Sequence, residues 1–296
     1  MDPALPSAAG RFGDVASVDL ANDPALAAVL DGSVPIIPTD PVRMLLIVAA
    51  SFVFHGLVFW AAPVRRAKGE LSVRMWVVST VHAVNLAVAA AAYLVASRLE
   101  RFHGPTQLLN GVAGTVDEWC SPVLAYSTGY FVWDTLVMLR YKELHDVGGT
   151  IHHFIIFPSL MLAFFSGVSP PMQLAFFVEE ASTPFLNIRS IYRGVNERIY
   201  QVCGYLFAFF FFASRLVMGS YIYVSCVHVY LRYGAVMLPA WQKQGAFLWQ
   251  LVMATLSRGL NLYWGALILR KLFRGGSAAS TDSAKRPRPV ANGKEH

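Results

Sequence analysis

Charged residues and cysteine are both scarce in this sequence. Only 14% of its 296 residues are charged, which is too few for the surface of a soluble protein of this length. Its three cysteines are too few and too scattered for a disulfide framework or a metal cluster. The first residues lack the basic start and the apolar core of a cleavable signal peptide. A soluble domain, a disulfide scaffold and a cysteine-ligated metal centre are therefore excluded.

Hydrophobic residues, by contrast, make up 55% of the chain, and the mean hydropathy is +0.47. A helix needs about 20 apolar residues to cross the hydrocarbon core of a bilayer. The runs that meet this requirement are 44–62, 73–96, 123–139, 151–168, 172–188, 202–229 and 247–269. The sequence therefore predicts an all-α, polytopic membrane protein with about seven transmembrane helices in one bundle.

The net charge of +6 follows from basic residues in the loops between the apolar runs rather than on one continuous face. This distribution predicts no nucleic-acid partner. Sixteen of the 24 Lys and Arg residues fall on one side of the predicted membrane and six on the other. By the positive-inside rule, the C-terminus is expected in the cytosol and the N-terminus in the lumen or outside the cell.

The order of apolar and polar stretches divides the chain into four parts. We expect a mostly disordered tail at 1–41, a first transmembrane helix with a basic loop at 42–72, six further transmembrane helices at 73–274, and a basic polar tail at 275–296. Only the turn 169–171 separates the fourth and fifth spans, which predicts a tight antiparallel hairpin. This hairpin would place Asn187 beside His153 and Ser182 beside Pro158.

Several ionisable or amide side chains fall inside the predicted spans. Such a group costs a few kcal/mol in hydrocarbon unless it faces the bundle interior or water, so each is a candidate site residue. They are Asp134, His152, His153, Glu179, Glu180, Arg215, Arg258 and Asn261. With a rise of about 1.5 Å per residue, Asp134 lies roughly 9 Å and Glu180 roughly 13 Å inside the cytosolic edge. A polar layer in the cytosolic half of the bundle is expected.

Two interpretations of this layer stay open at the level of the sequence. In the first, three acids and two arginines neutralise one another and have a structural role only. In the second, Asp134, His152, His153 and Glu180 line a lipid-accessible cavity in which an imidazole acts as base or nucleophile. The isolated histidines of the first two spans, His55 and His82, are expected to be core or interface residues.

Three motifs in the third to fifth spans carry a family resemblance. They are Tyr130-Phe131-Val132-Trp133-Asp134, Ile151-His152-His153-Phe154 and Glu180-Ala181-Ser182-Thr183-Pro184-Phe185-Leu186-Asn187. In this order and spacing they resemble the TLC-domain family of translocating-chain-associating, Lag and CLN proteins. The likeness extends from about Val73 to Arg274 and looks closest to the TLC-domain-containing subgroup linked to lipid homeostasis.

The resemblance implies a six-helix TLC-type bundle, a multi-pass protein of the endoplasmic reticulum, and a role in lipid metabolism with a membrane lipid as partner. It implies no cofactor and leaves a homo-oligomer open. A lipid would lie in a polar cavity lined by Glu180, Asn187, Ser182, Arg215, Arg258, Asn261 and Tyr130. Whether the protein is an enzyme is left open by the sequence.

Two alternatives to lipid binding follow from the same resemblance. Ceramide synthases of this family use a histidine pair, so a sphingoid-base N-acyltransferase would employ His152 and His153, with Asp134 as the orienting acid and acyl-CoA as co-substrate. This chain lacks the further acidic residues of their longer motif and has Pro158 in that region. The other alternative is a vesicle cargo receptor.

Two further classes of membrane protein are disfavoured by single residues. The His-x-x-His-His box of elongases has Gly149 at its first position here, and no His-x-x-x-His pair exists for an iron-dependent oxidase. A retinal protein needs a lysine in the middle of the seventh span, which has none. Both classes are set aside.

Overall fold

The fold is described from a computed structural model of the chain. The structure describes residues 40–63, 69–96, 120–145, 147–166, 170–237 and 241–283. The N-terminal tail predicted at 1–41 therefore lies almost entirely outside the described residues, as does the chain beyond Ser283. Within the described ranges the secondary structure is helical and contains no strand. The all-α prediction is confirmed.

The first four spans are single helices. Their bounds are α3 (Pro41–Ala61), α4 (Glu70–Ala96), α7 (Ser121–Arg140) and α8 (Val147–Ser166), with a short 3₁₀ turn, η4 (Lys142–Leu144), between α7 and α8. The Asp40 side chain caps α3 by accepting a hydrogen bond of 2.8 Å from the backbone N–H of Arg43. Pro158 lies inside α8 without ending it, as membrane helices permit.

Two of the last three spans are composite. The fifth span joins α9 (Pro170–Phe176), the 3₁₀ segment η5 (Phe177–Ser182) and α10 (Thr183–Tyr192). The sixth span joins α11 (Glu197–Phe210), the π-helix η6 (Phe211–Met218) and α12 (Gly219–Met237). The seventh span is the single long helix α13 (Trp241–Ser283). Both non-α segments carry ionisable residues, and π-helical turns are frequent at functional sites. By its length, α13 continues well past the predicted end of the last span and into the expected tail.

These helical segments coincide with the seven runs predicted from hydropathy. Three stretches meet a strict criterion of length and hydropathy for a membrane span, namely Pro41–Ala61, Glu70–Val95 and Glu197–His228, and Val147–Ala163 is a shorter apolar helix. The chain is a polytopic membrane protein.

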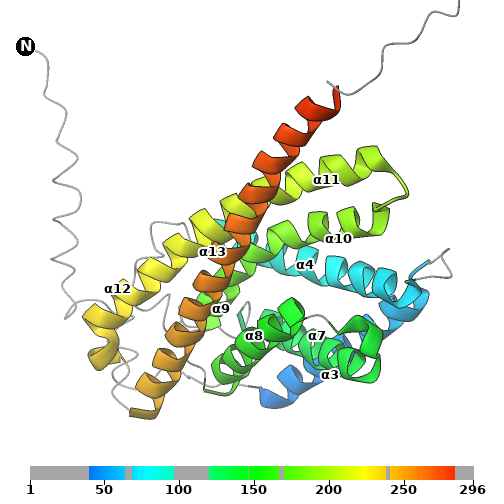
Figure 1. Cartoon of the computed structure of the whole chain (residues 1–296). Coiled ribbons are helices and arrows are strands. Elements are labelled where there is room, and N and C mark those ends of the chain that lie inside the picture. Colours follow the sequence, from blue (N-terminus) through cyan, green and yellow to red (C-terminus); the bar gives the residue numbers. More distant parts are fainter. Residues whose placement is uncertain are drawn as a thin grey trace, which may run out of the picture.

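The contacts between helices arrange six of the spans in a ring, and Figure 1 shows three of them, α4, α10 and α11, side by side. Around this ring α4 packs against α10, α10 against α11, η6 and α12 against α13, α13 against α8, α8 against α7, and α7 against α4. The remaining span, α3, packs outside the ring against α7. The interface between α3 and α7 is close because Gly129 has no side chain there: a Cβ at this position would overlap the carbonyl oxygen of Val48 and come within 2.7 Å of Ser51 Cβ.

The ring order corrects one prediction. α8 packs chiefly on α7 and α13, whereas α10 packs on α4 and α11, so the fourth and fifth spans are not an antiparallel hairpin along their lengths. Only α9, the part nearest the turn, stays beside α8. The placement of Asn187 directly beside His153 and Ser182 beside Pro158 by hairpin packing was therefore wrong. Each helix finds its apolar partners elsewhere in the ring.

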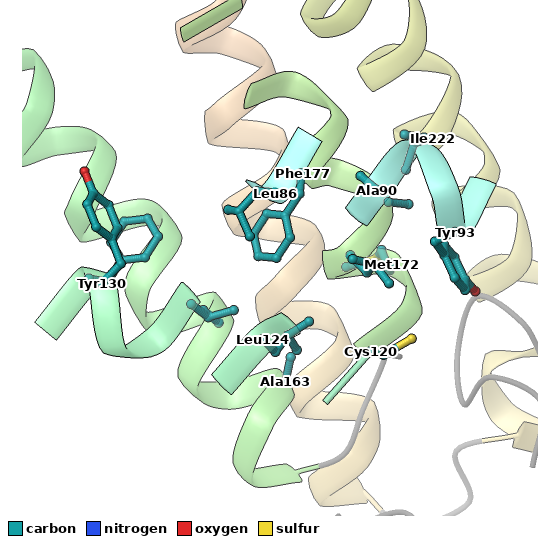
Figure 2. Close-up of a cluster of buried hydrophobic side chains, with 14 of the residues drawn as sticks. Leu86, Ala90, Tyr93, Cys120, Leu124, Tyr130, Ala163, Met172, Phe177 and Ile222 are labelled. Carbon is teal, nitrogen blue, oxygen red and sulfur yellow. The ribbon is translucent and has the colours of Figure 1, made fainter. Parts of the chain in front are cut away.

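Part of the apolar core lies in the half of the ring away from the basic loops. Figure 2 shows Leu86 and Ala90 of α4, Leu124 of α7, Met172 of α9 and Ile222 of α12 converging there. Each of these side chains is buried. The packing of this end leaves the polar residues of the spans to line the other part of the ring.

Candidate functional site

A cavity of about 850 Å³ lies inside the ring. All six spans of the ring contribute to its wall, and η4 contributes at its margin. This volume is in the range of small-molecule and cofactor sites. The wall includes ten of the candidate residues of the sequence: Tyr130, Asp134, His152, His153, Glu179, Glu180, Ser182, Asn187, Arg215 and Arg258. The structure therefore brings together side chains from five separate spans.

His153 and Asp134 form a hydrogen-bonded pair on one wall. Nε2 of His153 lies 2.8 Å from Oδ2 of Asp134, and Nδ1 lies 3.1 Å from the hydroxyl of Thr135. An ionised carboxylate only accepts, so Nε2–H donates to Asp134, and in the neutral imidazole Nδ1 accepts from the Thr135 hydroxyl. Both ring nitrogens are thus engaged. His153 can take a proton from a ligand only when one of these hydrogen bonds is exchanged.

His152, the other member of the histidine pair, also lines the cavity. Its ring centroid lies 6.2 Å from that of His153 and 6.2 Å from that of Phe131. It is also within electrostatic reach of Glu180 and Arg215 on the facing spans. The two histidines therefore have different surroundings: His153 is tied to α7, and His152 faces the charged groups across the ring.

Arg215 is held at the opposite wall by the π-helix η6. Its guanidinium donates to Ser182 Oγ at 3.1 Å, to Thr183 Oγ1 at 3.3 Å and to Asn261 Oδ1 at 3.4 Å. Its Nη2 also lies 3.7 Å from the Glu180 carboxylate, which accepts a hydrogen bond of 2.7 Å from Thr183. The 3₁₀ segment η5 and the start of α10 thus form a polar cradle for this arginine.

Arg258 and Glu179 make a second, deeper ion pair. Arg258 donates to the Glu179 carboxylate and, at 2.6 Å, to the backbone carbonyl of Arg215. Asn261 donates to the same carboxylate at 3.0 Å. The pair passes directly over Gly219, where a Cβ would overlap both the guanidinium and the carboxylate. This network links α13, η5 and η6.

A stack of aromatic and imidazole rings closes a third part of the wall. His82 of α4 stacks on Tyr130 of α7, with ring centroids 3.7 Å apart and an angle of 14° between the planes. Behind it, His55 of α3 donates through Nδ1 to the Ser51 carbonyl at 2.7 Å, and its Nε2 lies 3.2 Å from the Tyr126 hydroxyl. His55 is therefore a satisfied core residue, as predicted, while His82 lines the cavity.

The two interpretations of the polar layer both describe part of this arrangement. Glu179, Arg258 and Asn261 neutralise and hydrogen-bond one another, and Asn261 is not among the residues of the cavity wall. The histidine pair, Asp134, Glu180 and Arg215 line the cavity, as Glu179 and Arg258 also do. Sequence reasoning missed Thr135, Thr183 and Gly219. A threonine or glycine carries no charge to mark it inside an apolar run, so only its neighbours in the fold reveal its role.

Several buried polar atoms in this wall have no hydrogen-bond partner among the described residues. They include Nδ1 of His82, Oδ1 of Asp134, Nδ2 of Asn187 and Nε of Arg258. Buried donors and acceptors without a partner are uncommon in folded proteins and call for a ligand or water. Among the described residues there is no group of three or more His, Cys, Asp or Glu side chains that could hold a metal ion.

The ring of helices around a polar cavity defines a polytopic membrane protein with an internal cavity. A model of the TLC domain matches residues 72–270, which covers the whole ring. The chain belongs to the TLC-domain family, and the resemblance of its three motifs is confirmed.

Two curated relatives give the extent of the likeness. The chain is 31% identical over 123 residues to topoisomerase I damage affected protein 4 of Saccharomyces cerevisiae. The matched region covers 39% of this chain and 44% of the yeast protein. The chain is also 28% identical over 156 residues to the TLC domain-containing protein L438 of Acanthamoeba polyphaga mimivirus. This matched region covers 51% of this chain and 72% of the viral protein. The chain thus spans less than half of the yeast relative. No solved structure matches it.

Proposed function

We propose that this protein binds a membrane lipid in the cavity of the helix ring and acts in membrane lipid homeostasis. The observation that carries this proposal is the 850 Å³ cavity, whose wall combines apolar side chains with the His153–Asp134 pair and Arg215. A cavity inside a membrane bundle that is lined only for packing would be apolar. A polar cavity holds water or an amphipathic occupant that offsets the cost of the buried groups, and the apolar part of this wall favours a lipid.

The wall supplies complementary groups for the polar part of such a lipid. Arg215 and Asn187 offer N–H donors on one side, and Asp134 and Glu180 offer carboxylate acceptors. A lipid carrying both donors and acceptors in its headgroup, such as an amide, an amine or a hydroxyl, suits this mixture better than a bare anion. Its acyl chain would lie among the apolar residues of α4, α8 and α13.

A matched pair of tryptophan substitutions on α13 tests lipid binding. Ala254 lines the cavity, whereas Ala266 on the same helix is exposed and does not. Native mass spectrometry of the full chain released from nanodiscs should show a retained lipid in the wild type and in Ala266→Trp. Ala254→Trp should lose that lipid because the indole fills the cavity. Equal retention in both variants would contradict the proposal.

Acyl transfer is a second candidate, favoured by the hydrogen-bonded His153–Asp134 pair inside a cavity that also contains His152. In this reaction a histidine removes the proton from the amine of a lipid base, the amine attacks the thioester carbonyl of an acyl-CoA, and free thiol leaves as the amide forms. The loop at η4, beside the cavity, would admit the nucleotide part from the cytosol.

Purified protein incubated with acyl-CoA and a panel of long-chain bases tests this candidate. If it is right, an amide forms and His153→Ala lowers its rate by about 100-fold or more, the usual contribution of a positioned acid–base group. His228→Ala is the control, because His228 of α12 is exposed and lies outside the cavity wall. No amide with any base would leave lipid binding as the function.

We further propose that the basic loops face the cytosol and that the protein resides in the endoplasmic reticulum. The positive-inside distribution of Lys and Arg supports this orientation, and the family resemblance supports the compartment. A protease-protection assay on microsomes with a C-terminal epitope tag tests the orientation, since a cytosolic tag should be digested without detergent.

A further inference from the structure

The wall of the cavity reaches the surface of the protein at two places of opposite chemistry. Among the described residues of the wall, those that are exposed are Glu143, His145, Leu186 and Leu267. The first two are polar and lie on the connection between α7 and α8. Leu186 of α10 and Leu267 of α13 are apolar, and they are 38% and 44% exposed. The cavity is therefore bordered by a polar opening and by an apolar one.

The order of helices in the ring explains the apolar opening. α13 packs on η6 and α12, which leaves α11 and the C-terminal part of α13 without extensive packing against each other. In Figure 1, α11 and the red end of α13 run in different directions. Phe207 of α11 and Trp264 of α13, both partly buried, also line the cavity on this side. On this side the cavity wall is therefore aromatic and aliphatic and lies between two helices that do not pack closely on each other, which we call the gap between α11 and α13.

The depth of this gap matches the boundary between acyl chains and headgroups. Leu186 lies three residues before Arg189, and Leu267 lies three residues before Arg270. At about 1.5 Å per residue, both leucines are one helical turn, roughly 4.5 Å, inside the level of the basic side chains. Basic residues of this kind sit at the membrane surface. The gap therefore faces the hydrocarbon of the leaflet next to the basic loops.

We propose that this gap between α11 and α13 is a lateral portal through which the acyl chain of a membrane lipid passes between the bilayer and the cavity. The proposal rests on the lipid-binding function proposed above. A chain that passed through the polar opening at Glu143 and His145 would have to enter water, whereas a chain that passed Leu186 and Leu267 stays in contact with apolar groups throughout. The polar opening is then free to admit water or a water-soluble group.

Lipid exchange kinetics test the portal. The full chain in nanodiscs is loaded with a lipid whose chain carries a photoreactive diazirine, and its replacement by unlabelled lipid is followed by native mass spectrometry. Leu267→Trp should slow exchange several-fold with little change in occupancy at equilibrium, because a bulky ring narrows the gap without filling the cavity. Leu262→Trp is the matched control: Leu262 is 63% exposed on the same helix and does not line the cavity.

Photocrosslinking of the loaded wild type gives an independent readout. Irradiation should place adducts on Leu186, Phe207 or Leu267 in addition to residues inside the cavity, and more adducts there than on Leu262. If Leu267→Trp does not fold, Leu186→Trp narrows the opening from α10, which packs against α11.

The outcomes separate the portal from the function on which it rests. If the portal variants exchange lipid at the wild-type rate while the cavity stays loaded, the portal is wrong and lipid binding stands. If the wild type holds no lipid and no adduct falls inside the cavity, the proposed function fails and the portal fails with it.

Discussion

Gly219 shows how a single residue supports the site. The ion pair between Arg258 and Glu179 passes over it, and a Cβ there would overlap both charged groups. Gly219→Ala should therefore separate a buried pair and destabilise the protein by about 3 kcal/mol. Thermal unfolding in nanodiscs measures this as a lower midpoint.

Gly259→Ala is the control for this substitution. Gly259 follows Arg258 on the same helix, and a Cβ there meets no atom within 4 Å. Its replacement should leave the midpoint unchanged or raise it slightly, since alanine favours a helix over glycine by about 0.5–1 kcal/mol. Equal midpoints for the two variants would show that the ion pair moves aside without cost.

At the residue scale, the sequence predicted the charged members of the site because an ionisable side chain in an apolar run is conspicuous. It did not predict which of them pair. Asp134 pairs with His153 of the next span, and Glu179 of the fifth span pairs with Arg258 of the seventh. Pairing depends on rotation of each helix about its axis, which hydropathy does not determine. The role of His82 in the cavity wall was missed for the same reason.

At the scale of elements, α3 lies outside the region matched by the family and yet packs closely on α7. A Cβ on Gly129 would overlap the backbone of α3 at Val48. Gly129→Ala should force the two helices apart and lower stability by about 1–3 kcal/mol, as overpacking does. Because α7 carries Asp134, a loss of retained lipid should accompany this change.

Gly56→Ala provides the comparison at the same interface. A Cβ on Gly56 would approach Trp133 Nε1 only to 3.4 Å, which is an ordinary contact. This variant should unfold near the wild-type temperature, measured in the same nanodiscs. If Gly129→Ala unfolds at the same temperature as Gly56→Ala, the close approach of α3 to α7 at Gly129 does not contribute to stability.

The elements themselves were largely predictable. The seven apolar runs coincide with the helical segments, because length and hydropathy alone determine what can cross a bilayer. The 3₁₀ segment η5 and the π-helix η6 were not predicted, since the residues within them have no pattern that distinguishes them from an α-helix. The predicted hairpin of the fourth and fifth spans failed because a short turn fixes only the residues next to it.

At the scale of the whole molecule, six spans surround a cavity whose charged groups come from separate helices, and this convergence is the basis of the proposed lipid site. The ring order followed from the contacts of the structure and could not be read from seven similar apolar runs. The family match then agrees with the extent of the ring, since residues 72–270 comprise its six spans.

The most direct test of the account is a cryo-electron microscopy map of the full chain in lipid nanodiscs. The account predicts elongated density inside the ring, with a polar end within hydrogen-bond distance of Arg215 or Asp134 and a tail leading towards the gap between α11 and α13. A cavity occupied by side chains alone, or lipid density only on the outer surface of the helices, would contradict it.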